Sequence, residues 1–221
     1  MSAYATGMAG KWHLGHQKER FLPLNQDSLT VRCTTDATDF IEAHSGREQS
    51  FFYYLAYNVP HLPIHTTEEV RGRSDAGLYG DVIETVDWSA GRVRAALDEQ
   101  GVADNTIVFF ASDNGPWLNL PDRMLQAGNK PWHQGTTGPL RGAKATSYEG
   151  DARAPAMIRR PGQIEARVDT DELVASPDIY RTLLNAAGAD APDLPLNGHE
   201  GARRIDAARG AVFLEEGLAN S

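Results

Sequence analysis

Two apolar runs of strand length, separated by one long amphipathic helix, constrain the fold of this chain more than any other feature. Residues 51–57 and 106–111 are continuous runs of aromatic, aliphatic and β-branched residues, a pattern typical of strands that are buried on both faces. Between them, apolar residues recur at intervals of three and four from Tyr79 to Leu97, and Gly101 follows as a stop signal. Strands that alternate with helices indicate an α/β layer fold.

Weaker signals extend this alternation along the chain. Residues 154–158 form a candidate short strand, and a helix is predicted to begin with Ser176 as N-cap and to end at Gly188. Residues 115–142 are rich in Gly, Pro, Asn and Trp and are too long for a simple connection, so we expect a functional loop there. The residues after 191, with their two prolines, are expected to be irregular.

Charge and cysteine content limit the range of partners. The 221 residues include 21 Lys+Arg and 30 Asp+Glu, a formal net charge of -9, which argues against general binding of nucleic acid. The single cysteine, Cys33, excludes an internal disulfide and a cysteine-rich metal site. No run reaches the length of a membrane span, and the first residues lack the pattern of a secretory signal. We therefore expect no nucleic-acid and no membrane partner, and we assign no localisation.

Polar side chains follow both apolar runs, at the place where α/β sheets bind their ligands. His61 comes shortly after the first run, and Asp113 and Asn114 come directly after the second. The two oxygen donors suit calcium or magnesium better than zinc or copper. Taken alone, however, Asp-Asn-Gly is also a turn signal, and a single histidine is more often structural than catalytic.

Cationic side chains gather in two glycine-flanked segments. Lys11 and His13 are two residues apart and would face the same side of an extended chain. Lys144 ends the glycine-rich segment 138–144, where the backbone can approach a ligand closely, although a solvated basic turn is the simpler interpretation of that segment alone. Together, the oxygen donors, histidines and lysines suit a site that neutralises an anionic tetrahedral ester. Their spacing does not separate phosphate from sulfate.

The same segments, in the same order, resemble the motifs of the sulfatase family, particularly the arylsulfatase A and N-acetylgalactosamine-6-sulfatase branch. The resemblance implies an alkaline-phosphatase-like α/β fold, in which helices flank a mostly parallel sheet. It also implies hydrolysis of sulfate monoesters of small molecules or glycans. The segments that carry it are 10–15 (GKWHLG), 57–61 (YNVPH), 112–116 (SDNGP) and 138–144 (GPLRGAK). The resemblance continues through 79–89, 149–156, 160–162 and 178–184.

This resemblance also implies roles for the ionisable candidates. Lys11 and Lys144 would contact the sulfate group, and His13 would support the catalytic aldehyde hydrate. His61 would protonate the leaving alcohol or otherwise contact the sulfate. These roles are chemically consistent, because the departing oxygen gains negative charge as the ester bond breaks.

The resemblance implies two cofactors, and the sequence departs from the family at both. Asp113 and Asn114 would bind the metal, usually calcium in this family, with magnesium as the alternative. Sulfatases also carry formylglycine, made from the cysteine of a Cys-x-Pro-Ser-Arg segment that follows a strand ending in paired aspartates. Neither feature occurs here, and Cys33 is not followed by the Pro and Arg of that segment. We therefore predict weak metal binding and impaired formylglycine-dependent turnover.

Relative to the family, the chain is expected to be truncated at both ends. We predict a partial sulfatase catalytic domain at residues 1–190 and an irregular C-terminal tail at residues 191–221. Because the absent first strand would lie centrally in the sheet, its neighbours would keep unpaired backbone groups. Self-association through exposed sheet edges is the expected consequence.

Two other interpretations remain open. The chain could be a metal-dependent phosphatase or phosphodiesterase of the alkaline phosphatase superfamily, with water or a substituted residue as nucleophile. It could also be a non-catalytic remnant that binds anions through its lysines and histidines. Phosphate ester turnover without sulfate ester turnover would favour the first interpretation, and anion binding without turnover would favour the second.

Overall fold

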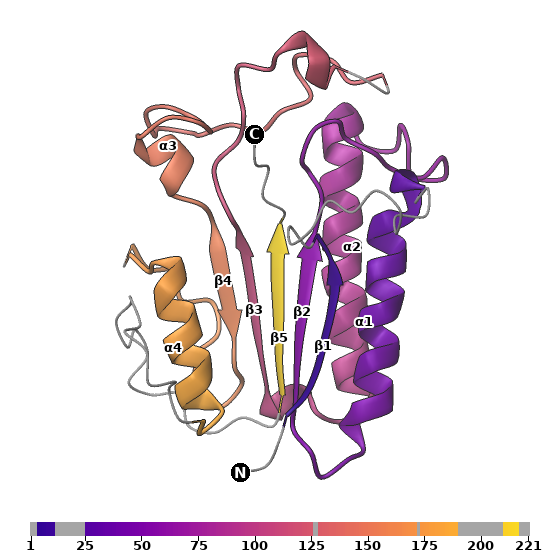
Figure 1. Cartoon of the computed structure of the whole chain (residues 1–221), viewed down its shortest axis with the longest axis vertical. Helices are drawn as coiled ribbons and strands as arrows, with labels where there is room; N and C mark the ends of the chain where they lie inside the picture. The colour runs from indigo at the N-terminus through magenta and orange to yellow at the C-terminus, as the bar shows by residue number, and fades with distance from the viewer. Residues whose placement is uncertain (1–3, 12–24, 126–127, 172, 190–209, 217–221) are drawn as a thin grey trace, which may run out of the picture.

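A five-stranded sheet in the order β1-β2-β5-β3-β4 forms the centre of the molecule (Figure 1). The structure is a computed structural model that describes residues 4–11, 25–125, 128–171, 173–189 and, as backbone, 210–216. The strands β1 (Ala5–Gly10), β2 (Phe51–Tyr57), β5 (Gly210–Glu216) and β3 (Thr106–Ser112) pair in parallel, and β4 (Ala156–Arg159) runs antiparallel to β3 at the edge. The prediction of an α/β fold with a mostly parallel sheet is confirmed.

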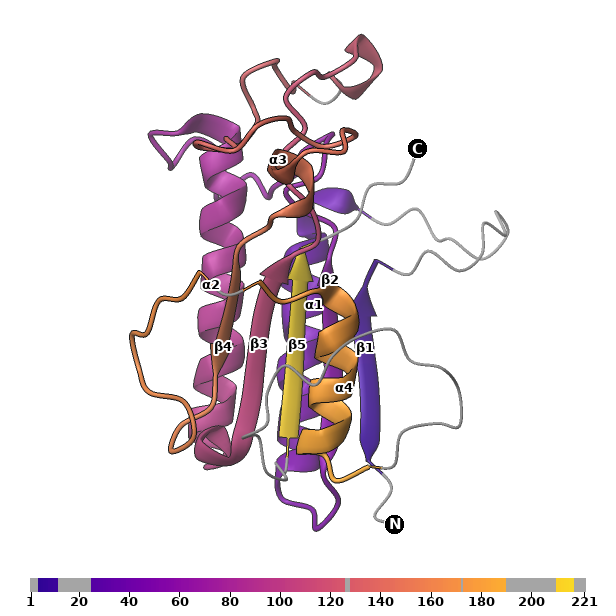
Figure 2. The ribbon, with the colours of Figure 1, turned by 90° about the vertical axis from the view of Figure 1, so that its left-hand side faces the viewer.

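Helices cover both faces of this sheet, which gives the molecule three layers (Figures 1 and 2). The long helices α1 (Leu29–Ser45) and α2 (Gly77–Glu99) pack against each other on one face. On the other face lies α4 (Ser176–Ala186), whose residues Leu183 and Ala186 pack against Ile107 of β3. The shorter helical segments are α3 (Glu149–Ala152) and the 3₁₀ turns Gln26–Ser28, Ala103–Asn105 and Asp122–Met124.

The elements with the strongest sequence signals form where they were predicted. β2 has the bounds of the first apolar run, and β3 extends the second run by one residue, to Ser112. The amphipathic stripe lies within α2, where Val82, Val86, Val93 and Leu97 are buried. Burial of such a stripe against the sheet and α1 is what stabilises a helix of this length.

One predicted cap differs in detail. Sequence analysis predicted Ser176 as the N-cap of α4. In the structure Ser176 is already the first residue of the helix, and Ala175 is the N-cap. The carboxylate of Asp178 accepts the backbone N–H of Ala175 at 2.9 Å, so that a side chain inside the first turn caps the helix.

Buried hydroxyl groups tie the carboxyl end of β2 to both long helices. The Tyr57 hydroxyl lies 2.6 Å from Ser89 Oγ on α2, and Ser89 Oγ lies 2.5 Å from Thr34 Oγ1 on α1. Thr34 also donates to the carbonyl of Thr30 at 2.7 Å. A satisfied buried network of this kind fixes its members in one arrangement. This network therefore holds Tyr57, the last residue of β2, in place at the start of the segment that leads to His61.

The central strand comes from the part of the chain that was expected to be irregular. Gly210 of β5 pairs with Phe51 and Thr106, and Glu216 pairs with Tyr57 and Ser112. The expectation that the strands beside the central position lack backbone partners is therefore wrong for the described sheet. The run Gly-Ala-Val-Phe-Leu-Glu-Glu has the apolar content of a central strand, although the prolines earlier in the tail are typical of irregular structure.

Candidate active site

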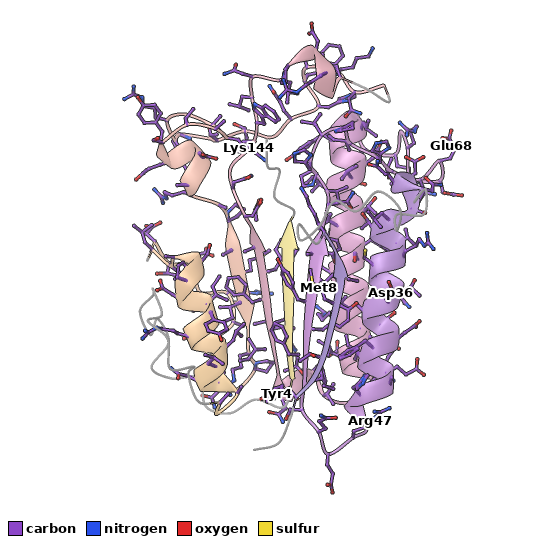
Figure 3. All side chains as sticks on the ribbon, in the orientation of Figure 1. Tyr4, Met8, Asp36, Arg47, Glu68 and Lys144 are labelled. Atoms are coloured by element: carbon purple, nitrogen blue, oxygen red, sulfur yellow. The ribbon has the colours of Figure 1, made fainter. Side chains whose placement is uncertain are left out.

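A cavity of about 640 Å³ opens at the carboxyl end of the parallel strands. Figure 3 shows Lys144 beyond this end of the sheet, with Tyr4 at the opposite end. Ligands of open α/β sheets bind at this location. The cavity is lined by residues that follow β2 (60–62), by Tyr79 and Ile83 of α2, by residues at the end of β3 and after it (112–117), and by residues 134–138, 140, 144, 150 and 153–155.

Backbone hydrogen bonds hold the loops around this cavity together. The Lys144 N–H donates to the carbonyl of Pro116 at 3.0 Å, and the Gly115 N–H donates to the carbonyl of Asp151 at 2.7 Å. A side chain at position 115 would collide with the carbonyl oxygen of Gly150. Glycine at position 115 thus allows the segment after β3 to touch α3, which brings Lys144 next to the end of β3.

A buried amide joins the His61 segment to the opposite loop. Asn129, only 2% exposed, accepts the backbone N–H of Ile64 through Oδ1 at 2.9 Å and donates to the Ile64 carbonyl through Nδ2 at 3.2 Å. His61 precedes Ile64 by three residues, and residues 134–138 follow Asn129 closely. The two segments face the same cavity, so this contact fixes one segment relative to the other.

Two lysines and one carboxylate lie close enough at this site to change each other's ionisation. Burial lowers the pKa of Lys11, the positive charge of Lys144 lowers it further, and Asp113 opposes both effects. Burial also lowers the pKa of Lys144, against the charges of Asp113 and Asp151. Two partly desolvated cations beside a single carboxylate make a site that favours an added anion.

Asp113 and Asn114 present oxygen atoms of the kind that a hard divalent cation prefers. Asp113 Oδ2 is buried and has no hydrogen-bond partner among the described residues, and burial raises the pKa of this carboxyl group, with Lys144 opposing the rise. The Asn114 amide nitrogen donates to the Gly115 carbonyl at 3.1 Å, which leaves Oδ1 as the atom to offer a cation. In kind, the donors fit a metal ion.

In number, the donor set falls short. Calcium takes about six to eight oxygen ligands. Within the described part of the chain, no group of three or more His, Cys, Asp and Glu side chains is placed to hold a metal ion. A cation held by Asp113 and Asn114 would therefore need water, substrate or further groups to complete its coordination.

The predicted site residues occupy different positions relative to the cavity. His61, Asp113, Asn114 and Lys144 line it. Lys11 does not line the cavity; it directly follows β1, and its N–H donates to the carbonyl of Ala56 at 2.8 Å. His13 lies outside the described residues.

Cys33 lies on α1 within the hydrophobic core and is 5% exposed. Burial raises the pKa of its thiol to about 11, and the negative charge of Asp36 adds to the effect. A thiol in such surroundings is a packing residue rather than a reactive one.

Trp117, Tyr79 and Arg153 are among the residues of the cavity wall to which the sequence analysis gave no role. Trp117 lies beside Lys144, whose Nζ is 6.0 Å from the centre of the indole ring. Tyr79 belongs to α2, where its place in the apolar stripe and in a segment that resembles the family indicated no role in the site. Arg153, held at 3.3 Å by Glu149, occurs in a segment that matched the family, but it was given no role. Tyr79 and Arg153 come from segments whose helical or family pattern gave no sign of the cavity.

The fold and these groups define an α/β protein whose candidate site gathers lysine, histidine and carboxylate side chains at the carboxyl end of its parallel strands. The sulfatase family model matches residues 16–189, and the chain belongs to the sulfatase family. Proteins of this family generally use a metal ion and formylglycine. Among the described residues, no helix combines the length and apolar character needed to cross a membrane.

Curated relatives and solved structures agree with this assignment. Human steryl-sulfatase is 34% identical over 171 residues, which cover 77% of this chain and 28% of the relative. Human N-acetylgalactosamine-6-sulfatase is 34% identical over 186 residues, which cover 82% of this chain and 34% of the relative. The chain thus spans about a third of the length of these relatives.

Two solved structures share the fold. A structure from the glycosaminoglycan metabolism of Bacteroides thetaiotaomicron superposes with a TM-score of 0.64 at 30% identity, covering 77% of this chain and 35% of the other. Ps i-CgsB, solved in complex with k-i-k-neocarrahexaose, superposes with a TM-score of 0.69 at 23% identity. The superposition covers 88% of this chain and 53% of the other.

Proposed function

We propose that this chain binds the sulfate group of a sulfate monoester at the cavity beyond β3 and takes part in hydrolysis of that ester. The observation that carries the proposal is the mutual influence of Lys11, Lys144 and Asp113 on their ionisation, at a cavity that His61 lines. Family membership supplies the ester class. The substrate would be a small-molecule or glycan sulfate.

The two lysines and His61 would act on different oxygens of the ester. Lys11 and Lys144 would hold the terminal sulfate oxygens, whose negative charge offsets the unfavourable proximity of the two cations. His61 would donate a proton to the leaving oxygen as its bond to sulfur breaks, and the water consumed in hydrolysis would supply the oxygen that sulfur gains.

Asp113 and Asn114 would hold a divalent cation, with calcium as the expected ion and magnesium as the alternative. The support is the buried Asp113 Oδ2, which lacks a hydrogen-bond partner among the described residues, and the free acceptor side of the Asn114 amide. When bound, the cation would add positive charge beside the sulfate oxygens. It would also neutralise a carboxylate that burial disfavours in its ionised form.

Formylglycine does not fit the residues present. The only cysteine of the sequence is Cys33, and it is buried in the core on α1 rather than at the cavity. We assign no step to that group, and the proposal concerns anion binding and protonation of the leaving oxygen.

The first test is calorimetric titration of the full chain with inorganic sulfate at pH 7. Lys144→Ala should weaken sulfate binding by about 10- to 100-fold, because one charge-assisted contact is lost. Lys130→Ala, an exposed lysine outside the cavity lining, is the matched control and should bind like the wild type. Equal affinity in the wild type and both variants would refute the assignment of Lys144.

The second test is hydrolysis of paired aryl sulfate and aryl phosphate esters, with and without added calcium. Calcium-dependent sulfate release that Lys144→Ala abolishes supports the proposed reaction. Phosphate release alone would replace it with the phosphatase interpretation. Sulfate binding without turnover of either ester would reduce the function to anion binding.

A further inference from the structure

The described sheet consists of two halves that share no backbone hydrogen bond except through β5. β1 pairs with β2 on one side, and β3 pairs with β4 on the other. β5 lies between the halves and pairs in parallel with β2 and with β3 along all seven of its residues. Figure 1 shows β5 in this central position.

The two halves carry different parts of the candidate site. Lys11 directly follows β1, and His61 lies in the segment that leaves β2. Asp113 directly follows β3, and Lys144 is tied to the segment after β3 by its hydrogen bond to Pro116. The distance between the lysines thus depends on how β2 is held relative to β3.

We propose that residues 210–216 are a closing strand, which enters a slot between β2 and β3 and thereby sets the two halves of the site in register. The slot fits one type of occupant: an extended, apolar segment of seven residues that runs parallel to both neighbours. The strands on both sides present a full row of donors and acceptors to be satisfied, and an occupant shorter than seven residues leaves some of them unpaired.

The C-terminal segment of the same chain is the occupant that the structure supports. Residues 187–209 connect α4 to β5. At about 3.3 Å per extended residue, a connection of this length spans many times the spacing of about 4.8 Å between neighbouring strands. The segment can therefore reach the slot within one molecule. A strand donated by a second copy would fill the same slot but would produce a dimer.

The strand also delivers acidic residues to the rim of the sheet. Glu216 pairs with Tyr57 and Ser112, the last residues of β2 and β3, and Glu215 precedes it. The register thus places the backbone of two acidic residues between the segment that leads to His61 and the segment that begins with Asp113. Loss of β5 would change the spacing of this rim.

The test is backbone hydrogen exchange on the full chain, a readout that does not depend on sulfate binding or activity. In the unmodified protein, amides of 211–216 should be protected on the same time scale as those of β2 and β3. Val212→Pro should raise exchange in β2 and β3 by about tenfold or more, because proline cannot donate to the ladder of a central strand. Val212→Ile, which keeps the N–H, the β-branch and the apolar character of the residue, is the matched control and should leave exchange in β2 and β3 close to that of the unmodified protein.

Addition of the strand as a separate peptide distinguishes two causes of fast exchange in the Val212→Pro protein: an empty position between β2 and β3, and misfolding of the whole protein. A synthetic peptide of residues 208–218, added in excess to the Val212→Pro protein, should restore protection in β2 and β3. Unprotected amides at 211–216 in the unmodified protein would overturn the proposal, and so would equal protection in both variants. A dimeric unmodified protein that becomes monomeric on Val212→Pro would also overturn it, since the occupant would then be the strand of a second copy.

Discussion

Asn129 binds both main-chain polar groups of Ile64 through its side-chain amide, at 2.9 Å and 3.2 Å. A side-chain amide suits this position because its oxygen accepts while its nitrogen donates. The contact joins two segments that are far apart in the sequence and that face one cavity. The packing of Asn129 against Ile64 therefore fixes the distance between the His61 segment and the opposite wall of the cavity.

Replacement of Asn129 by alanine should lower the free energy of unfolding by about 1–3 kcal/mol, since both buried groups of Ile64 lose their partner. Urea denaturation measures the change. Asn119→Ala is the matched control, because Asn119 is exposed and its loss should change stability by no more than about 0.5 kcal/mol. Equal unfolding midpoints for the two variants would remove the structural role given to Asn129.

A pair of glycine substitutions tests the close approach between the segment after β3 and α3. Gly115→Ala places a methyl group against the carbonyl oxygen of Gly150, so it should destabilise the fold by about 1–3 kcal/mol and weaken sulfate binding. Gly91→Ala, on α2, meets no atom within 4 Å and should stabilise the protein by about 0.5–1 kcal/mol. Thermal unfolding of both variants gives the comparison, and a stabilising Gly115→Ala would show that the two segments are not in contact.

The ionised form of Asp113 is the one that would bind a cation, but burial makes this form unfavourable for the stability of the fold. Burial raises the folded-state pKa of Asp113 above its ordinary value of 3.8, with Lys144 and then Lys11 acting in the opposite direction. Above the folded pKa, the ionised carboxyl group therefore reduces stability. As the pH falls through the folded pKa, the folded state takes up the proton first, and the penalty has disappeared once the pH is below 3.8.

Asp113→Asn should therefore raise the free energy of unfolding at pH 7, and this gain should vanish below pH 3.8. Calcium should raise the melting temperature of the wild type and leave that of the variant unchanged. Asp122→Asn, an exposed position outside the cavity lining, serves as the control for both measurements. A calcium response of equal size in wild type and Asp113→Asn would contradict a cation site at Asp113.

Sequence reasoning predicted the elements whose residues repeat with a clear period. The bounds of β2 and the apolar stripe of α2 follow from local patterns, because each buries its residues against a continuous core. The same holds for Asp113 and Asn114, which follow a buried strand at the sheet end where ligands bind. These features depend on residues that are close together in the sequence.

The features that were missed depend on pairing between distant segments. β5 has an apolar run, but its central place is set by two neighbours more than 90 residues earlier in the chain. Arg153 and Trp117 reach the cavity only through the packing of loops around Gly115. No periodic pattern in the sequence around Arg153 or Trp117 indicates that these loops pack together at the cavity. Reasoning from local sequence therefore gave the two residues no role.

Cys33 provides the last prediction, because it separates a packing thiol from a modified or reactive one. Burial raises the pKa of its thiol to about 11, so the thiolate is scarce at pH 8. We expect the native protein to resist a thiol-specific reagent and the urea-unfolded protein to react fully, with an intact mass that corresponds to unmodified cysteine. Cys33→Ala should lower stability by about 1 kcal/mol through lost packing and leave sulfate affinity unchanged. Rapid labelling of the folded protein, or a mass that reports an aldehyde at Cys33, would show instead that this residue performs chemistry of its own.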